Sequence, residues 1–97
     1  DGAMSSIEAL PAIVDAVGNK AEVWMDSGIR SGQDVLRAIA LGARGTLIGR
    51  AFLYGLGARG QAGVRQALDI IHKELDLTLG LCGQSDLATV DSSILVK

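Results

Sequence analysis

The chain has 97 residues, of which 48% are hydrophobic and 21% charged, and a formal net charge of −2. A chain of this length forms at most one domain, and its small, mixed charge does not favour nucleic-acid binding. Its single cysteine excludes an intrachain disulfide or a cysteine-built zinc site. No apolar run approaches the ~18 residues of a membrane span and no leader-type segment is present, so a cytoplasmic protein is expected.

The first predicted element is a helix within residues 5–18, whose apolar residues recur at helical spacing. Ser5 and Glu8 have the spacing of a capping box at its start. Pro11 would remove a hydrogen bond inside a helix, so we expect the regular helix to begin near it. Gly18 is expected to end the helix.

Two short apolar segments, residues 21–25 and 46–49, are expected to form strands. The segment between them, residues 31–45, has the pattern of an amphipathic helix that a glycine near its end would stop. Ser31 and Asp34 resemble a cap pair at its start. Because the strands are apolar throughout and alternate with helices, the sequence predicts parallel βαβ units covered by helices.

The second half of the chain is predicted to be mainly helical. Residues 50–63 are punctuated by glycine and are expected to hold one short helix. Residues 64–82 form the clearest amphipathic helix, with Leu68 in its buried stripe and charged residues such as Glu74 in solvent. Residues 84–97 are expected to form a turn, which could be helical, and then an extended tail.

Glycine and arginine follow both predicted strands. Asp26–Gly32 comes after the first strand and Gly49–Arg50 after the second. In parallel α/β folds ligands bind beyond the carboxyl ends of the strands, where glycine lets backbone N–H groups approach an anion and arginine suits phosphate oxygens. Either cluster alone could be an ordinary turn with a solvated arginine. Two such clusters after successive strands together favour a phosphate site of the kind found in (β/α)8 barrels.

The segment "DSGIRSGQDVLRAIALGARGTLIGR" resembles the flavin-phosphate segment of the FMN-dependent 2-hydroxy-acid dehydrogenase and oxidase family. The resemblance continues through "AFLYGLGARGQAGVRQALDIIHKELDLTLGLCGQSDLATV", and bacterial L-lactate dehydrogenases look most similar. It implies a fold of the α/β class, in which residues 1–97 form a single partial domain. That domain would be the C-terminal quarter of a (β/α)8 TIM barrel: its last two βα units, the preceding helix and a tail at 84–97.

The resemblance also implies FMN as cofactor and oxidation of an L-2-hydroxy acid, such as lactate, to the 2-oxo acid. It assigns cofactor-binding roles to Asp26, Ser27, Gly28, Ile29, Arg30, Gly49 and Arg50. Asp26 would accept a hydrogen bond from a ribityl hydroxyl, and Ser27–Ile29 would line the phosphate loop with backbone groups. Arg30, Gly49 and Arg50 would approach the phosphate. The family usually has glycine at the position of Ser27, and we interpret this serine as tolerated variation.

In the resembled family a His-Gly-x-Arg element, which carries the base and the substrate-gripping arginine, lies just before the position of Asp1–Gly2. We therefore expect no catalytic residue in this chain and no activity from it alone. No metal site is expected either. His72 is expected to be a partly exposed helix residue, Cys82 a small buried hydrophobe and Trp24 part of the core. The parent protein is expected to be a homo-oligomer that could associate peripherally with the inner membrane.

Two alternatives remain open at this stage. Other phosphate-binding barrels, such as type-2 isopentenyl-diphosphate isomerase and IMP dehydrogenase, share a version of the glycine–arginine pattern. The chain could also be a non-catalytic fragment that self-associates, because two strands alone leave open sheet edges that recruit partners.

Overall fold

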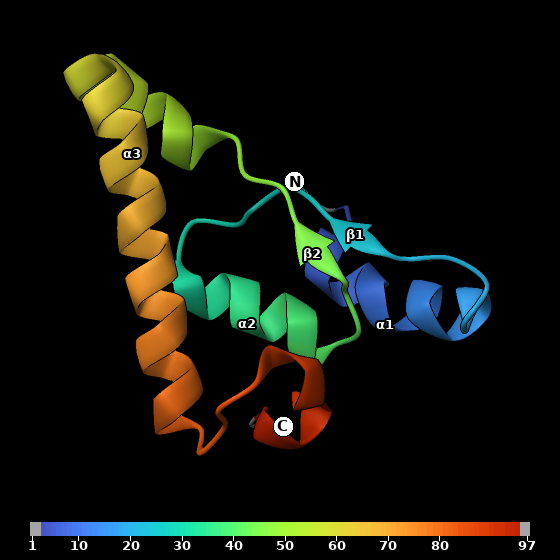
Figure 1. The fold of residues 1–97 in the computed structure, drawn as a ribbon. Coiled ribbons are helices and arrows are strands. Elements are labelled where there is room, and N and C mark those ends of the chain that lie inside the picture. The colour runs from blue at the N-terminus through green and yellow to red at the C-terminus, as the bar shows by residue number, and fades with distance from the viewer. Residues whose placement is uncertain (1–2, 96–97) are drawn as a thin grey trace.

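The computed structural model describes residues 3–95, so Asp1 and Gly2, at the expected end of the catalytic element, lie outside the described residues. The elements follow in the order α1 (Ser6–Val17), β1 (Trp24–Met25), α2 (Gly32–Ala40), β2 (Gly45–Thr46), α3 (Arg50–Leu81), and the 3-10 turns η1 (Leu87–Thr89) and η2 (Ser92–Ile94). Figure 1 shows α1 and α2 beneath the two strands, and the long part of α3 running beside α2. The class is α/β, as the sequence predicts.

β1 and β2 pair in parallel, with Trp24 opposite Gly45 and Met25 opposite Thr46. α2 connects them, which makes β1–α2–β2 one βαβ unit. β1 is shorter than the predicted segment 21–25, and β2 begins one residue before the predicted segment 46–49 and shares only Thr46 with it. Among residues 3–95 each strand has a partner on one side only, so few ladder hydrogen bonds define it.

The core is small and lies between the strands, α1 and α2. Its buried cluster consists of Leu10, Met25, Ile29, Ala38 and Ala43. The expectation that Trp24 belongs to this core is wrong, because its side chain is 54% exposed. Successive side chains of a strand point to opposite faces, so burial of Met25 turns Trp24 outward.

α1 begins at Ser6, five residues before Pro11, so the expectation that the helix starts near Pro11 is also wrong. The predicted capping box is present: the Ser5 hydroxyl accepts from the Glu8 N–H, and the Glu8 carboxylate accepts from the Ser5 N–H, each at 3.3 Å. These two bonds fix the first turn, and the helix tolerates the one hydrogen bond that Pro11 removes. Gly18 ends the helix as predicted, at φ +59°.

α3 consists of two helical segments joined at Arg59 and Gly60, whose backbone angles are not helical. The first segment is the short helix expected within residues 50–63, and the second is the long helix. The two segments touch backbone to backbone at Gly55 and Gly63, where a Cβ on either glycine would overlap the other's carbonyl group. Small residues therefore define the bend that Figure 1 shows at the top of α3.

The placement of Leu68 in the buried stripe of the long helix is wrong, because this side chain is 50% exposed. Helical spacing places Leu68 on the same side of the helix as Ile71, Leu75 and the buried Leu79, but α3 lies against the start of α2 at residues 71–75. The contact uses the helix backbone near Leu75 itself, which lies against Gly32 of α2. Leu68 precedes this contact, so its position along the helix, and not its face, leaves it exposed.

Two leucines near the end of α3 test this packed face. Leu79 is 9% exposed and Leu81 is 79% exposed. In the full-length protein we expect Leu79→Ala to lower the free energy of unfolding by about 2–3 kcal/mol, as burial of a leucine predicts. Leu81→Ala should change it by less than about 0.5 kcal/mol. Urea melts of the two variants measure the difference, and equal losses would show that the face is assigned wrongly.

The tail forms two 3-10 turns instead of a single turn and an extended end. Asp86 and Asp91 start these turns by accepting hydrogen bonds from the N–H groups of Ala88 and Ser93, each at 2.9 Å. Hydrogen bonds from the side chain and the backbone of Ser93 lower the pKa of Asp91. Within residues 3–95, no helix combines the length and the apolar character that crossing a membrane requires.

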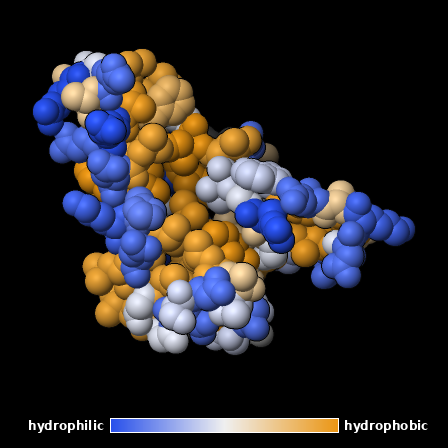
Figure 2. Space-filling view, viewed as in Figure 1, coloured by the Kyte–Doolittle hydropathy of each residue, from blue (hydrophilic) through white to orange (hydrophobic). Residues whose placement is uncertain are grey.

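Large apolar side chains remain exposed over much of the surface. Figure 2 shows them gathered along the inner side of α3 and across the centre of the molecule, while polar residues cover the outer side of α3. The exposed set includes Trp24, Leu47, Leu53, Tyr54, Leu56, Leu68, Ile70, Leu77 and Leu81. Contiguous apolar surface of this kind is uncommon on soluble monomers and is typically covered by other protein.

Candidate functional site

The loops that follow β1 and β2 line one cavity of about 350 Å³. All the residues singled out from the sequence lie in its wall, namely Asp26, Ser27, Gly28, Ile29, Arg30, Gly49 and Arg50. Leu47, Ile48 and Leu53 complete the lining. The parallel pairing of the strands brings the two loops to the same edge of the sheet, as predicted.

The loop after β1 is anchored at its start and in its middle. The Leu47 N–H donates to the Met25 carbonyl at 2.9 Å, which ties the end of β1 to the neighbouring chain segment. Ile29 is 3% exposed and holds the loop to the core through its side chain. Between these anchors Ser27 and Gly28 have φ values of +71° and +84°, so the chain turns through two successive left-handed residues.

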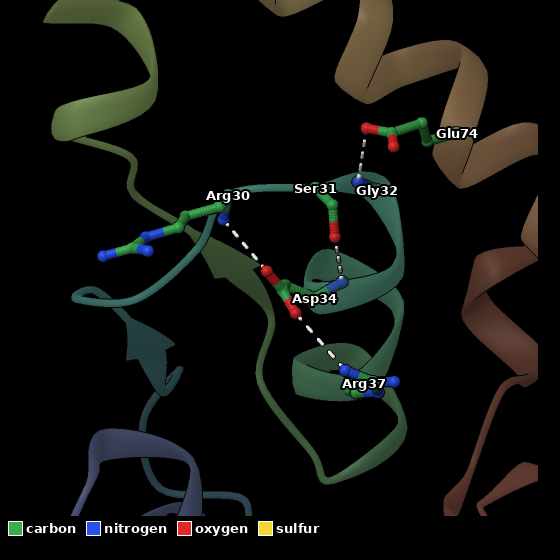
Figure 3. A network of polar contacts seen from close by, with 6 residues as sticks. All are labelled: Arg30, Ser31, Gly32, Asp34, Arg37 and Glu74. Atoms are coloured by element: carbon green, nitrogen blue, oxygen red, sulfur yellow. Dashed lines mark hydrogen bonds and ion pairs between the residues drawn. The ribbon is translucent and has the colours of Figure 1, made fainter. Parts of the chain in front are cut away.

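Asp34 anchors the other end of this loop from the first turn of α2 (Figure 3). One carboxylate oxygen accepts from the Arg30 N–H at 3.0 Å, and the other lies 3.4 Å from Nη1 of Arg37. The Ser31 hydroxyl accepts from the Asp34 N–H at 3.2 Å, which is the predicted cap. The Arg30 side chain points away from α2 in Figure 3, so its guanidinium is not used by this network.

Glu74 reaches the same helix start from the long segment of α3. Its carboxylate accepts a hydrogen bond from the Gly32 N–H at 3.3 Å (Figure 3). The expectation that Glu74 lies on a solvated face is therefore wrong. Because the two residues are 42 positions apart, no local sequence pattern predicts the contact. Ser31 and Glu74 together close the N-terminus of α2 with side-chain oxygens.

The N-terminus of α3 is open by contrast. Gly49 caps it without a side-chain hydrogen bond, and its first turn holds no acidic residue. Within residues 3–95 every other helix or 3-10 turn begins with a side-chain oxygen bonded to a backbone N–H. A Cβ built on Gly28 or Gly49 would meet nothing within 4 Å, so space lies beside both. Free N–H groups at a helix start, next to Arg30 and Arg50, suit an anion.

Other reactive side chains are not part of the wall of this cavity. His72 is 73% exposed, as expected, and its Nε2 lies 4.0 Å from an Asp76 carboxylate oxygen. Cys82 is half-buried, less than expected, and Tyr54 is 69% exposed. No group of three or more His, Cys, Asp or Glu side chains in the described part of the chain is placed to hold a metal ion.

The parallel βαβ connectivity places the chain in the α/β class, with a glycine–arginine cavity at the strand ends. Comparison with known proteins narrows that class, because the family model for FMN-dependent dehydrogenases matches residues 1–97. The chain belongs to the FMN-dependent dehydrogenase family.

Curated relatives agree with this assignment. An L-lactate dehydrogenase of Caulobacter vibrioides (strain NA1000 / CB15N) is 55% identical over 97 residues, which is 100% of this chain and 25% of that relative. An L-lactate oxidase of Nostoc sp. (strain PCC 7120) is 50% identical over 95 residues, or 98% of this chain and 26% of that protein. The chain thus spans about a quarter of the length of these relatives.

Solved structures of the same kind superpose well. A mandelate oxidase variant with a monooxide FMN adduct matches 91% of this chain and 28% of its own, with a TM-score of 0.85 and 48% identity. A soluble mutant of the membrane-associated (S)-mandelate dehydrogenase from Pseudomonas putida matches 97% of this chain and 26% of its own, with a TM-score of 0.89 and 39% identity. The arrangement of strands and helices is therefore shared with part of these enzymes.

Proposed function

We propose that the cavity at the ends of β1 and β2 binds the phosphate end of FMN. The observation that supports this most strongly is the open N-terminus of α3, which meets two arginines and two unobstructed glycines at one cavity. A phosphate dianion would satisfy the free N–H groups and accept charge-assisted hydrogen bonds from Arg30 and Arg50. The start of α2 offers no such place, because Ser31 and Glu74 occupy it.

Each residue of the cavity has a distinct part in this proposal. Arg50 stands in the first turn of α3, where its guanidinium and the neighbouring N–H groups would bind the same phosphate. Arg30 would approach from the other loop. Asp26, exposed at the end of β1, would accept a hydrogen bond from a ribityl hydroxyl, since a carboxylate is an acceptor only. Gly28 would let the loop backbone approach the cofactor closely.

We further propose that the complete protein oxidises an L-2-hydroxy acid to the 2-oxo acid, with lactate as the first candidate substrate. FMN, when bound, accepts the hydride equivalent that leaves the substrate. This chain would hold and orient the cofactor, and the base and the carboxylate-binding arginine would lie in the remainder of the protein. The lactate and mandelate enzymes named above favour this activity over that of an isopentenyl-diphosphate isomerase or an IMP dehydrogenase.

The chain would serve as the C-terminal part of a (β/α)8 barrel, with residues 1–97 as one partial domain and 84–97 as its tail. Two observations support this arrangement: the strands each have one free edge, and the apolar surface in Figure 2 is uncovered. Neighbouring strands and helices of a barrel would cover both. The complete protein would be a cytoplasmic homo-oligomer or a peripheral protein of the inner membrane.

Comparison of FMN with riboflavin tests the proposed phosphate site, because riboflavin lacks only the phosphate. The full-length apoprotein should bind FMN at least about a hundredfold more tightly, since two or more charge-assisted hydrogen bonds contribute about 1.5–3 kcal/mol each. Quenching of flavin fluorescence on titration measures both affinities. Equal affinities would mean that the cavity does not bind a phosphate.

The isolated chain tests the proposal that the catalytic base and the substrate-binding arginine lie in the remainder of the protein. We expect it to show no lactate oxidation above the free-flavin background, because the proposed base and substrate-binding arginine are outside it. We also expect it to associate, because its exposed apolar side chains and free strand edges favour pairing with a second copy. An assay with an artificial electron acceptor and light scattering measure the two properties. Turnover, or a monodisperse monomer, would contradict the corresponding expectation.

A further inference from the structure

Ser27 has an unusual backbone for its residue type. Within residues 3–95 it is the only residue other than glycine with a positive φ, at +71°. The left-handed region brings a Cβ close to the following carbonyl oxygen, which glycine avoids. Ser27 is exposed, so no packing of its side chain in the core offsets this strain. Strained residues of this kind cluster at functional sites, where the strain serves binding or catalysis.

The hydroxyl of Ser27 has one partner among the described residues. Its Oγ donates to Oδ1 of Asp26 at 3.4 Å, while Oδ2 of Asp26 accepts no hydrogen bond from residues 3–95. Asp26 and Ser27 line the same cavity as the two arginines. The contact therefore restrains one carboxylate oxygen and leaves the other without a hydrogen bond among residues 3–95.

We propose that Ser27 is a positioning residue that orients the Asp26 carboxylate for the cofactor. This inference rests on the proposed function, in which Asp26 accepts a hydrogen bond from a ribityl hydroxyl. The serine at position 27 then contributes to cofactor binding, and its interpretation as tolerated variation is replaced. Its strained backbone is retained because the side chain that it carries prepares the FMN site.

Two physical effects would make the restraint useful. An exposed aspartate loses rotamer freedom when a ligand fixes it, and an existing hydrogen bond reduces that loss. In addition, Arg30 and Arg50 line the same cavity, so an unrestrained carboxylate could pair with a guanidinium and compete with the phosphate. By holding Asp26, the Ser27 hydroxyl would keep both cations available.

Two substitutions at Ser27 separate the hydroxyl from the backbone. Ser27→Ala keeps the Cβ and its strain but removes the hydroxyl, and in the full-length apoprotein it should weaken FMN binding about three- to tenfold. Ser27→Gly should weaken binding similarly and raise the melting temperature of the apoprotein by about 1–3 °C, since glycine relieves the strain. Ser92→Ala, an exposed serine in η2, is the control and should change neither value. If Ser27→Ala binds FMN like the unchanged protein, the proposal is wrong.

A double-mutant cycle with Asp26→Ala tests whether Ser27 acts through Asp26. If it does, adding Ser27→Ala to Asp26→Ala, which removes both carboxylate oxygens, should cause no further loss of FMN affinity. Additive losses would instead indicate a direct contact between the serine and FMN and would overturn the positioning role. The same titrations keep the two proposals distinguishable. If Asp26→Ala and Arg50→Met both weaken binding while Ser27→Ala does not, only the role of Ser27 fails. If none weakens it, the proposed FMN site fails as well.

Discussion

A Gly32→Ala variant of the full-length protein should lose about 3 kcal/mol or more of its free energy of unfolding. A Cβ at this position would overlap the backbone nitrogen of Leu75 and the carbonyl oxygen of Ile71. These are backbone atoms of a helix, so they cannot rotate aside as the end of a flexible side chain could. Helices α2 and α3 would have to separate, and the hydrogen bond from the Gly32 N–H to Glu74 would be lost with them.

Gly57→Ala is the matched control for this variant. Gly57 also lies in a helix, but a Cβ there would meet nothing within 4 Å. Because alanine favours helix over glycine by about 0.5–1 kcal/mol, we expect this change to be neutral or slightly stabilising. Urea denaturation of both variants gives the comparison. Similar stabilities would mean that α2 and α3 do not approach each other as closely as the structure places them.

Arg50→Met should weaken FMN binding by the full-length apoprotein about ten- to a hundredfold, which is the loss of one charge-assisted hydrogen bond of about 1.5–3 kcal/mol. Methionine keeps much of the length of the side chain but removes its charge and donors. Since the proposed partner is the phosphate, riboflavin should bind the variant and the unchanged protein equally well. The preference for FMN over riboflavin should therefore fall by the same factor.

Arg65→Met serves as the control for loss of a surface charge. Arg65 is exposed on the long segment of α3, outside the cavity wall. Its replacement should leave both flavin affinities unchanged at moderate salt, where exposed charges beyond about 10 Å are screened. Fluorescence titrations of the variants provide the test. Equal losses for both arginines would indicate a general effect of charge, and no loss for Arg50→Met would remove it from the phosphate site.

Features set by neighbouring residues could be predicted from the sequence. The Ser5 and Ser31 caps depend on a partner three residues ahead, and the end of α1 depends on Gly18. The cavity could also be predicted, because any two adjacent parallel strands place their following loops at one edge. Its two glycine–arginine clusters follow from order along the chain and residue type, whereas the roles of the individual residues come from the family resemblance.

Features set by residues far apart could not be predicted in this way. Glu74 has the spacing of a solvated helix residue, and only the packing of α3 on α2 brings it to Gly32. The periodic pattern of the long helix indicates a broad apolar arc, and Leu68 belongs to it by its spacing. The backbone contact of α3 with Gly32 of α2 falls at residues 71–75, beyond Leu68, so Leu68 stays exposed although its spacing is that of the packed face.

A crystal structure of the full-length protein with FMN tests the proposed site most directly. We expect phosphate oxygens within about 2.7–3.1 Å of the Arg50 guanidinium and of backbone N–H groups in the first turn of α3. The Asp26 carboxylate should accept from a ribityl hydroxyl while it keeps its contact with the Ser27 hydroxyl. A phosphate bound elsewhere, with residues 26–30 and 49–50 in contact with solvent only, would contradict this account.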